Sequence, residues 1–212
     1  MDRVFGPAEA KGGVKVDPSK TAVVFIEYQN EFTSEGGKLH AAVKEVMGDM
    51  LDKSSAVAAA ARDKGCVILH APITFKEDAS DNPNQNLGIL AGIKADKLFT
   101  EGTWNAAFDE KMRPQPGDKI VRGKKGLDAF PGTDLESILV DNGIETVALA
   151  GFLTNCCVES TMRAAYEKGF NTITLTDCCA TTTIEGHQAA TAGTFGMFSS
   201  PMTSDEFKAE LL

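Results

Sequence analysis

The strongest constraint on the fold is a buried strand that turns directly into a helix around residues 146–168. The run 146–150 is apolar and rich in small and β-branched residues, which is typical of a strand covered on both faces. From Val158 to Ala165 the apolar residues recur at helical spacing. Cys156 and Cys157 therefore lie where a strand passes into a helix.

Two interpretations of these thiols follow from their position. The first N–H groups of a helix lack intrahelical partners, and the positive end of the helix dipole favours an anion. Both effects lower the pKa of a thiol, and the thiolate is the reactive species. The alternative is that Cys156 and Cys157 are small apolar residues in a close-packed turn, since free cysteine is among the most buried residue types.

Composition narrows the class of protein. A chain of 212 residues is long enough for one domain with a large core, and we expect a single domain over 1–212 with residues 1–20 as a surface arm. The formal charge of −9 argues against a nucleic-acid groove. No apolar run approaches the roughly 20 residues of a membrane span. The N-terminus lacks the apolar core of a signal peptide, so the expected location is cytoplasmic.

The cysteine pattern favours reduced thiols. The chain has five cysteines, four of them in two adjacent pairs, which is a poor disulfide framework and lacks the spacing of a zinc site. The pair Cys156-Cys157 also lacks the Cys-x-x-Cys spacing of thiol redox proteins, which disfavours a redox function.

The alternation of strands and helices predicts an α/β fold. Helices are expected over 40–62, 156–168, 183–195 and 204–211. A further helix is expected to begin at the Thr133-x-x-Glu136 capping box and to end at Asn142-Gly143. Strands are expected over 21–26, 66–70, 119–121, 146–150 and 172–176, the last nearer the sheet edge. The prediction is a three-layer, Rossmann-like sandwich with a central, mostly parallel sheet flanked by helices.

Chemically active residues follow the strands of this sheet. In such sheets ligands bind beyond the carboxyl ends of the strands. That edge would hold Glu27, His70, residues 122–125, Cys157 and Asp177. Residues 71–116 show little regular pattern, and a connection this long is usually a lid or a wall of the site.

Three separated motifs resemble one known family, the isochorismatase-like cysteine hydrolases, which include nicotinamidases, N-carbamoylsarcosine amidohydrolases and ureidoacrylate or biuret amidohydrolases. The likeness covers about residues 20–180, with the motifs in the family's order. They are Val24-Phe25-Ile26-Glu27-Tyr28-Gln29-Asn30-Glu31-Phe32, Lys124-Lys125-Gly126-Leu127-Asp128-Ala129-Phe130-Pro131-Gly132-Thr133-Asp134-Leu135, and Gly151-(x)₂-Thr154-(x)₂-Cys157-Val158-Glu159-Ser160-Thr161.

The resemblance implies an isochorismatase-like hydrolase fold and a site for a small-molecule substrate. Cys157 matches the nucleophile, Glu27 the acidic position and Lys124 the catalytic lysine, although Lys125 is a rival in register. The N–H groups of Leu153 and Cys157 match the oxyanion hole, which usually follows a cis peptide bond, here Phe152–Leu153. Phe32 and Trp104 match aromatic pocket walls, or are plain core residues. Asn155 is expected to bind substrate, and Cys156 to be structural.

Two departures from the family pattern stand out. Glu27 occupies a position that nearly always holds aspartate, so its carboxylate is one methylene longer. Residues 71–100 contain no histidine and so no counterpart of the nicotinamidase metal ligands. We therefore expect no metal and no cofactor.

The sequence predicts a metal-independent cysteine hydrolase that cleaves a C–N bond of a small amide, ureido or carbamoyl-type compound through a thioester on Cys157. The alternative, motivated by Glu27, is a catalytically weak member of the fold that binds a small molecule or a partner. Because the family commonly forms dimers and tetramers, we expect a homodimer or homotetramer, with neither nucleic acid nor a membrane as partner.

Overall fold

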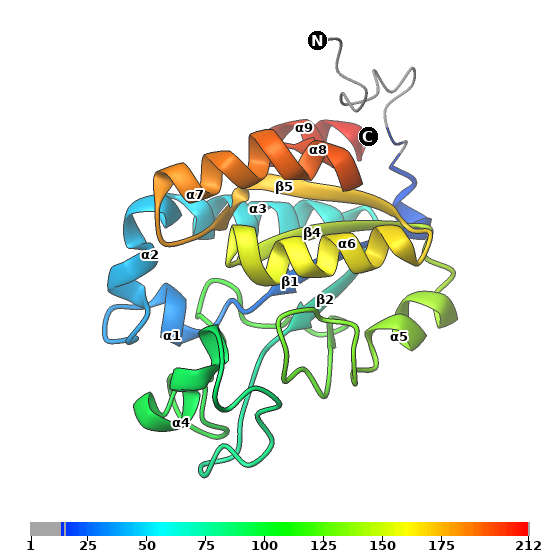
Figure 1. Ribbon diagram of the computed structural model, residues 1–212. Helices are drawn as coiled ribbons and strands as arrows, with labels where there is room; N and C mark the ends of the chain where they lie inside the picture. The colour runs from blue at the N-terminus through cyan, green and yellow to red at the C-terminus, as the bar shows by residue number, and fades with distance from the viewer. Residues whose placement is uncertain (1–13, 15, 212) are drawn as a thin grey trace.

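The computed structural model describes residue 14 and residues 16–211. Within this part of the chain, six parallel strands form one sheet in the order β3-β2-β1-β4-β5-β6 (Figure 1). The strands are β1 (Thr21–Ile26), β2 (Val67–Ala71), β3 (Lys119–Ile120), β4 (Thr146–Phe152), β5 (Asn171–Ala180) and β6 (Ser200–Met202). The predicted α/β fold with a parallel sheet is confirmed.

The two central strands are fully buried, as their apolar sequences predict. β1 pairs with β2 on one side and β4 on the other, so its end at Ile26 lies beside Ala71 and Gly151. Every residue of β1 and β4 is buried. This register places the residues that follow β1 and β4 next to each other at the carboxyl edge of the sheet.

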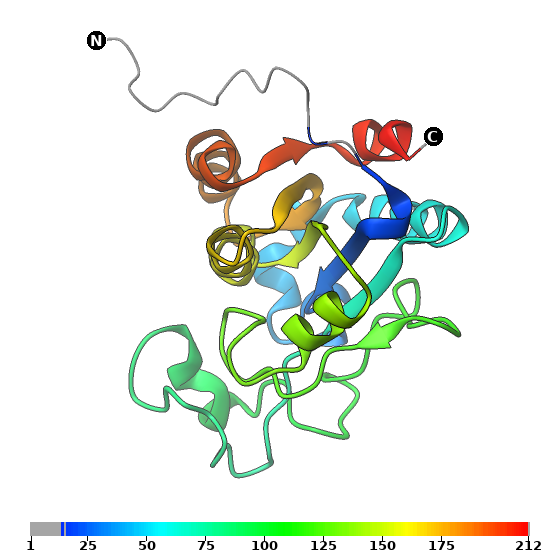
Figure 2. The same cartoon turned by 90° about the vertical axis from the view of Figure 1, so that its right-hand side faces the viewer.

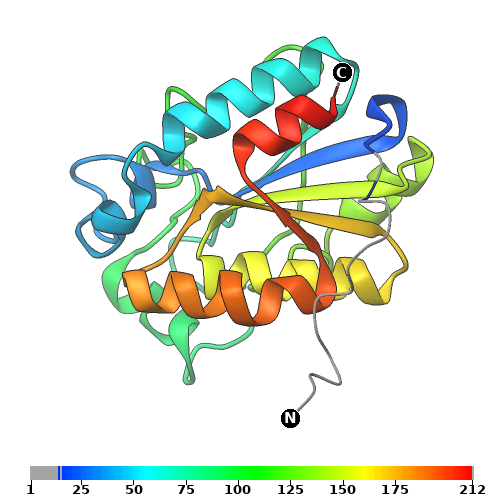
Figure 3. The same ribbon diagram turned by 90° about the horizontal axis from the view of Figure 1, so that it is seen from above.

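Helices cover both faces of the sheet, with the sheet between them (Figure 3). One face packs against α2, α3 and α9 through a cluster that includes Phe25, Val57 and Phe207. The other packs against α5, α6 and α8 through Val24, Leu139 and Met162. The α-helices are α1 (Asn30–Thr33), α2 (His40–Met47), α3 (Met50–Asp63), α4 (Ile93–Asp96), α5 (Leu135–Asp141), α6 (Glu159–Glu167), α7 (Ile184–Ala189), α8 (Phe195–Phe198) and α9 (Ser204–Glu210).

Some predicted helix boundaries were wrong. The helix expected over 40–62 is two helices, because Gly48 adopts a φ of 46° that a helix cannot contain. The helix expected over 183–195 begins as α7, passes through a π-helical turn (Ala190–Thr194) and continues as α8. The capping box expected at Thr133 does not form: α5 begins after Asp134, and the Thr133 hydroxyl accepts from the Leu135 N–H instead.

The segment between β2 and β3 lies outside the three layers, beside α1 (Figures 1 and 2). It contains only a 3₁₀ turn (Ile89–Gly92) and α4 as helical structure. Of the predicted surface arm over 1–20, residues 1–13 and 15 lie outside the described residues, and Pro18–Lys20 form a 3₁₀ turn. Among the described residues, no helix combines the length and apolarity that spanning a bilayer requires.

Candidate active site

Glu27 directly follows β1 and is held by the ends of the neighbouring segments. Its N–H donates to the Ala71 carbonyl (3.1 Å), and its own carbonyl accepts from the Gln29 N–H (2.7 Å). Its φ of 58° lies in the left-handed region that residues other than glycine rarely adopt. Such a conformation persists only where the surroundings enforce it, and it turns the buried carboxylate toward the carboxyl edge of the sheet.

Lys124 forms a buried ion pair with this carboxylate. Its Nζ donates to Glu27 Oε1 and to the Gly126 carbonyl (2.7 Å). Burial by itself would lower the pKa of Lys124, but the Glu27 carboxylate together with the two neighbouring cysteines outweighs burial and raises that pKa, which favours the charged lysine. The rival Lys125 points elsewhere, to Asp81 (2.7 Å) and the Thr74 carbonyl. The contact with Glu27 thus belongs to Lys124.

Cys157 is presented by the turn between β4 and α6. Gly151 begins this turn with a φ of 138°, and a Cβ there would meet the Ile26 carbonyl oxygen at 2.1 Å, so only glycine fits. The Phe152–Leu153 peptide bond is cis, as predicted. A π-helical turn (Thr154–Val158) follows. The carbonyl of Leu153, the residue before this turn, accepts from the N–H groups of Cys156 (3.0 Å) and Val158 (3.2 Å). Cys157 lies between these two donors.

Thr161 connects this turn to the loop that follows Lys124. Its hydroxyl donates to the Cys157 carbonyl (2.8 Å) and accepts from the Ala129 N–H (3.0 Å), five residues after Lys124. The side chain is fully buried. Thr161 was part of the third motif, but spacing alone gave no reason to assign it this positioning function.

The environment of Cys157 opposes ionisation in the free protein. Hydrogen bonding with Cys156, burial and the Glu27 carboxylate raise the pKa of Cys157 well above its usual value, and Lys124 acts against them. The predicted lowering of the thiol pKa is therefore wrong for Cys157. The physical reasons are the hydrogen bonding with Cys156, the almost complete burial of the thiol, which would cost a thiolate its hydration, and the Glu27 carboxylate, which repels a second negative charge.

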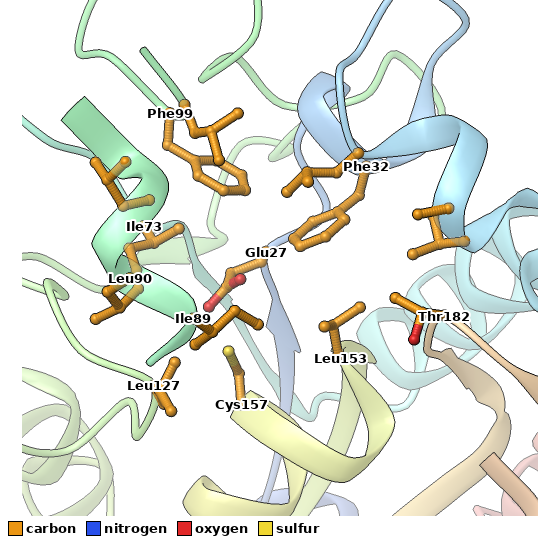
Figure 4. Close-up of a pocket in the computed structure, with 15 residues that line it drawn as sticks. Glu27, Phe32, Ile73, Ile89, Leu90, Phe99, Leu127, Leu153, Cys157 and Thr182 are labelled. Atoms are coloured by element: carbon orange, nitrogen blue, oxygen red, sulfur yellow. The ribbon is translucent and has the colours of Figure 1, made fainter. Parts of the chain in front are cut away.

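Glu27 and Cys157 line one cavity of about 130 Å³. The carboxylate and the thiol point into it and toward each other (Figure 4). Phe32 also lines it, stacked on Phe152 with ring centroids 5.0 Å apart, and so does Leu153. The segment 73–99 supplies a large part of the lining, so the prediction that this region forms a wall of the site is confirmed.

Other predicted residues lie away from this cavity. Trp104 is half-exposed beside Gly36 and lines a separate surface depression. Asn155 is exposed, and its Oδ1 accepts from the Thr181 hydroxyl (2.7 Å). His70 lies within β2, and its Nε2 contacts Asp118 (3.2 Å). Asp177 lies within β5, which runs further than predicted, and its carboxylate accepts from the Ser204 hydroxyl. Leu127, which lies in the second motif, and Thr182, which lies outside all three, also line the cavity, and the sequence analysis assigned neither of them to the site.

In the described part of the chain, no three His, Cys, Asp or Glu side chains come together in a way that could hold a metal ion. The absence of a metal requirement stays a prediction from the missing histidines.

The family model for the isochorismatase domain matches residues 21–206. The chain belongs to the isochorismatase family. Ureidoacrylate amidohydrolase RutB of Methylobacterium radiotolerans is similar to it, with 30% identity over 177 residues that cover 77% of this chain and 68% of that relative.

Solved structures of the isochorismatase fold agree with this assignment. A cysteine hydrolase from Pseudomonas syringae pv. phaseolicola superimposes with a TM-score of 0.84 at 22% identity, covering 93% of this chain and 94% of that one. N-carbamoylsarcosine amidase from Thermoplasma acidophilum gives a TM-score of 0.71 at 25% identity, covering 88% of this chain and 98% of that one. The predicted family and fold class are confirmed.

Proposed function

We propose that this isochorismatase-family protein is a cysteine hydrolase that cleaves a C–N bond of a small amide, ureido or carbamoyl-type compound through a thioester on Cys157. The observation that carries the proposal is that Cys157 and Glu27 face one another in a single cavity, with the charged Lys124 behind Glu27. The similarity to proteins named ureidoacrylate amidohydrolase and N-carbamoylsarcosine amidase supports hydrolysis at a C–N bond.

The first half of the reaction transfers the acyl group to sulfur. Because the pKa of Cys157 is raised, the thiol loses its proton to Glu27 as the sulfur attacks the carbonyl carbon. The N–H groups of Leu153 and Cys157 donate to the developing oxyanion. Glu27 then gives the proton to the leaving nitrogen, the C–N bond breaks, and a thioester remains on Cys157.

The second half returns the enzyme to its starting state. Water loses a proton to Glu27 and attacks the thioester carbonyl, the carbon–sulfur bond breaks, and the Cys157 sulfur regains the proton. Lys124 keeps its charge throughout and stabilises the Glu27 carboxylate whenever that group is ionised. The net reaction consumes one water and yields an acid and an amine or ammonia.

The proposal is tested by ammonia release from a panel of small amides, ureides and carbamoyl compounds. Cys157→Ala should remove all turnover and leave the secondary structure unchanged, because it deletes only the nucleophile. The matched control is Cys156→Ala, one residue away and half-buried, which should keep most of the activity. Full activity in Cys157→Ala would exclude this mechanism.

The second candidate, a protein that binds a small molecule without turnover, rests on Glu27 in place of aspartate. Here the longer side chain still reaches Lys124 and the cavity, which favours a working base. A binder would release no ammonia from any member of the panel, whereas a hydrolase would.

A further inference from the structure

The cavity that holds Cys157 is lined almost entirely by hydrocarbon. Twelve of its fifteen lining residues are apolar, among them Val43, Ile93, Phe99 and Leu127, and the polar ones are Glu27, Cys157 and Thr182. Three segments supply the apolar side chains: α1 with α2, residues 73–99, and the loops at 127 and 153. Beyond the scissile group, a bound substrate therefore contacts mainly hydrocarbon.

The charges around the cavity exclude an anionic substrate group. Among the described residues, no lysine or arginine lines it, and Lys124, which contacts Glu27, is itself buried and paired with that carboxylate. Lys38 and Lys97 line a different depression. A carboxylate placed among these apolar side chains would lose its hydration without gaining a partner, and Glu27 would repel it. The site therefore suits a neutral substrate.

The volume of the cavity limits the size of the group. At about 130 Å³ it is slightly smaller than an engineered apolar protein cavity of roughly 150 Å³ that binds benzene. A branched alkyl group of about four carbons or a single small ring fills such a space, and a longer chain does not. Filling it contributes binding energy in proportion to the apolar area removed from water.

We propose that the substrate is an uncharged primary carboxamide whose acyl substituent is a compact hydrocarbon group, with 3-methylbutanamide as the reference compound. This proposal rests on the proposed cysteine hydrolase function. The amide C–N bond breaks as the carbon–sulfur bond to Cys157 forms, the nitrogen leaves as ammonia, and water then releases the hydrocarbon acid. The carboxylate product is expelled by the same apolar, anionic surroundings that exclude charged substrates.

The first test compares kcat/KM for three amides. Acetamide lacks the hydrocarbon group and should be at least about 10-fold poorer than 3-methylbutanamide, since one methylene in an apolar pocket is worth roughly 10- to 200-fold. Succinamate has similar length but ends in a carboxylate and should be at least about 100-fold poorer. A preference for succinamate or for an anionic ureido acid, lost in Cys157→Ala, would overturn this substrate class and leave the hydrolase function standing.

A variant pair tests whether the lining sets the preference. Ile89 lines the cavity and is 56% exposed, so a lysine there can place its charge at the opening without being buried. Ile89→Lys should raise kcat/KM for succinamate relative to 3-methylbutanamide by at least about 10-fold. The control Leu87→Lys adds the same charge two residues away, on an exposed side chain outside the lining, and should leave the ratio unchanged. Equal shifts in both variants would contradict the proposal.

Binding of the amides to Cys157→Ser tests the proposed substrate class separately from the hydrolase function. Calorimetry should detect 3-methylbutanamide and no succinamate at equal concentrations. If the parent hydrolyses no compound while this selectivity of binding holds, the hydrolase function is wrong and the class of ligand is supported. If neither compound binds, the substrate class is wrong.

Discussion

The carboxyl edge of the sheet and the wall formed by residues 73–99 face the same cavity but are built in different ways. Glu27 and Cys157 follow strands whose register is fixed by backbone pairing, so their relative position depends on the sheet itself. The wall has little regular structure and supplies most of its contacts through aliphatic side chains. The groups for bond cleavage thus lie on the rigid part, and the groups that select a substrate lie on the irregular part.

The wall is nevertheless anchored, by side chains of the segment that follows Glu27. The buried Gln29 amide donates to the carbonyls of Ile73 (2.9 Å) and Ala106 (2.8 Å), and accepts from the Ile73 N–H (2.9 Å). The buried Glu31 carboxylate accepts from the Phe99 N–H (3.4 Å) at the end of the wall, and also from the Asn105 side chain beyond it. Long-range hydrogen bonds therefore fix the position of the wall, as strand pairing fixes the position of the edge.

After loss of the nucleophile itself, the largest change should come from removing the base at the edge. Glu27→Gln keeps the size of the side chain but cannot accept the thiol proton, so kcat should fall by about 10²–10⁴-fold. The variant also leaves Lys124 buried without a counter-charge, which destabilises a fold. Glu27→Gln/Lys124→Met removes both charges, and it should stay as inactive as the single variant. Recovery of activity in the double variant would show that misfolding, and not loss of the base, caused the defect.

The same variant, Glu27→Gln, should be alkylated faster at Cys157 even though its kcat falls. The Glu27 carboxylate raises the pKa of Cys157 and Lys124 lowers it, so removing the carboxylate lowers that pKa and increases the thiolate fraction at pH 7. Iodoacetamide should then label Cys157 faster in Glu27→Gln than in the parent, measured by mass spectrometry of the peptide. Slower labelling would place Glu27 away from the thiol.

The effect of Glu27→Asp should be smaller, about 10²-fold. Shortening the side chain withdraws the carboxylate by over ~1 Å, and a misplacement of that size costs about this much. The measurement is kcat on the best amide of the panel. An aspartate variant faster than the parent would show that the site has not adapted to glutamate.

The first prediction for the wall concerns its anchor. Gln29→Leu leaves three backbone groups of residues 73 and 106 without a partner, at about 1–3 kcal/mol per buried group, so the free energy of unfolding should fall by at least about 2 kcal/mol. KM should rise more than kcat falls, because Gln29 contacts the wall and not the reacting atoms. Gln85→Leu, exposed in the same segment, is the control and should change neither quantity. A loss confined to kcat would contradict the division between edge and wall.

The smallest effect is expected from chelation. Residues 71–100 contain no histidine, so prolonged treatment with EDTA should leave kcat/KM unchanged. Loss of activity that returns on adding zinc would reveal a metal site.

The difference between edge and wall also explains what could be predicted from the sequence. The strands β1 and β4 are apolar runs, so both could be predicted: β1 has the bounds expected, and β4 runs two residues beyond the expected end at residue 150. β6 was missed because three residues that include Pro201 carry no strand pattern. Trp104 and Asn155, which were expected to contact substrate, do not line the cavity, because hydrogen bonds between distant segments place them elsewhere. The raised pKa of Cys157 depends on hydrogen bonding with Cys156, on burial and on the Glu27 carboxylate, and only the folded chain buries the thiol and brings Glu27 to it.

The central claim, a thioester on Cys157, is tested most directly by partitioning with hydroxylamine. A primary amide and its N-methyl analogue would form the same acyl-enzyme, which water converts to the acid and hydroxylamine to the hydroxamate. The account predicts that both substrates give the same ratio of hydroxamate to acid at a fixed hydroxylamine concentration. A ratio that depends on the leaving amine, or hydrolysis without any hydroxamate, would contradict it.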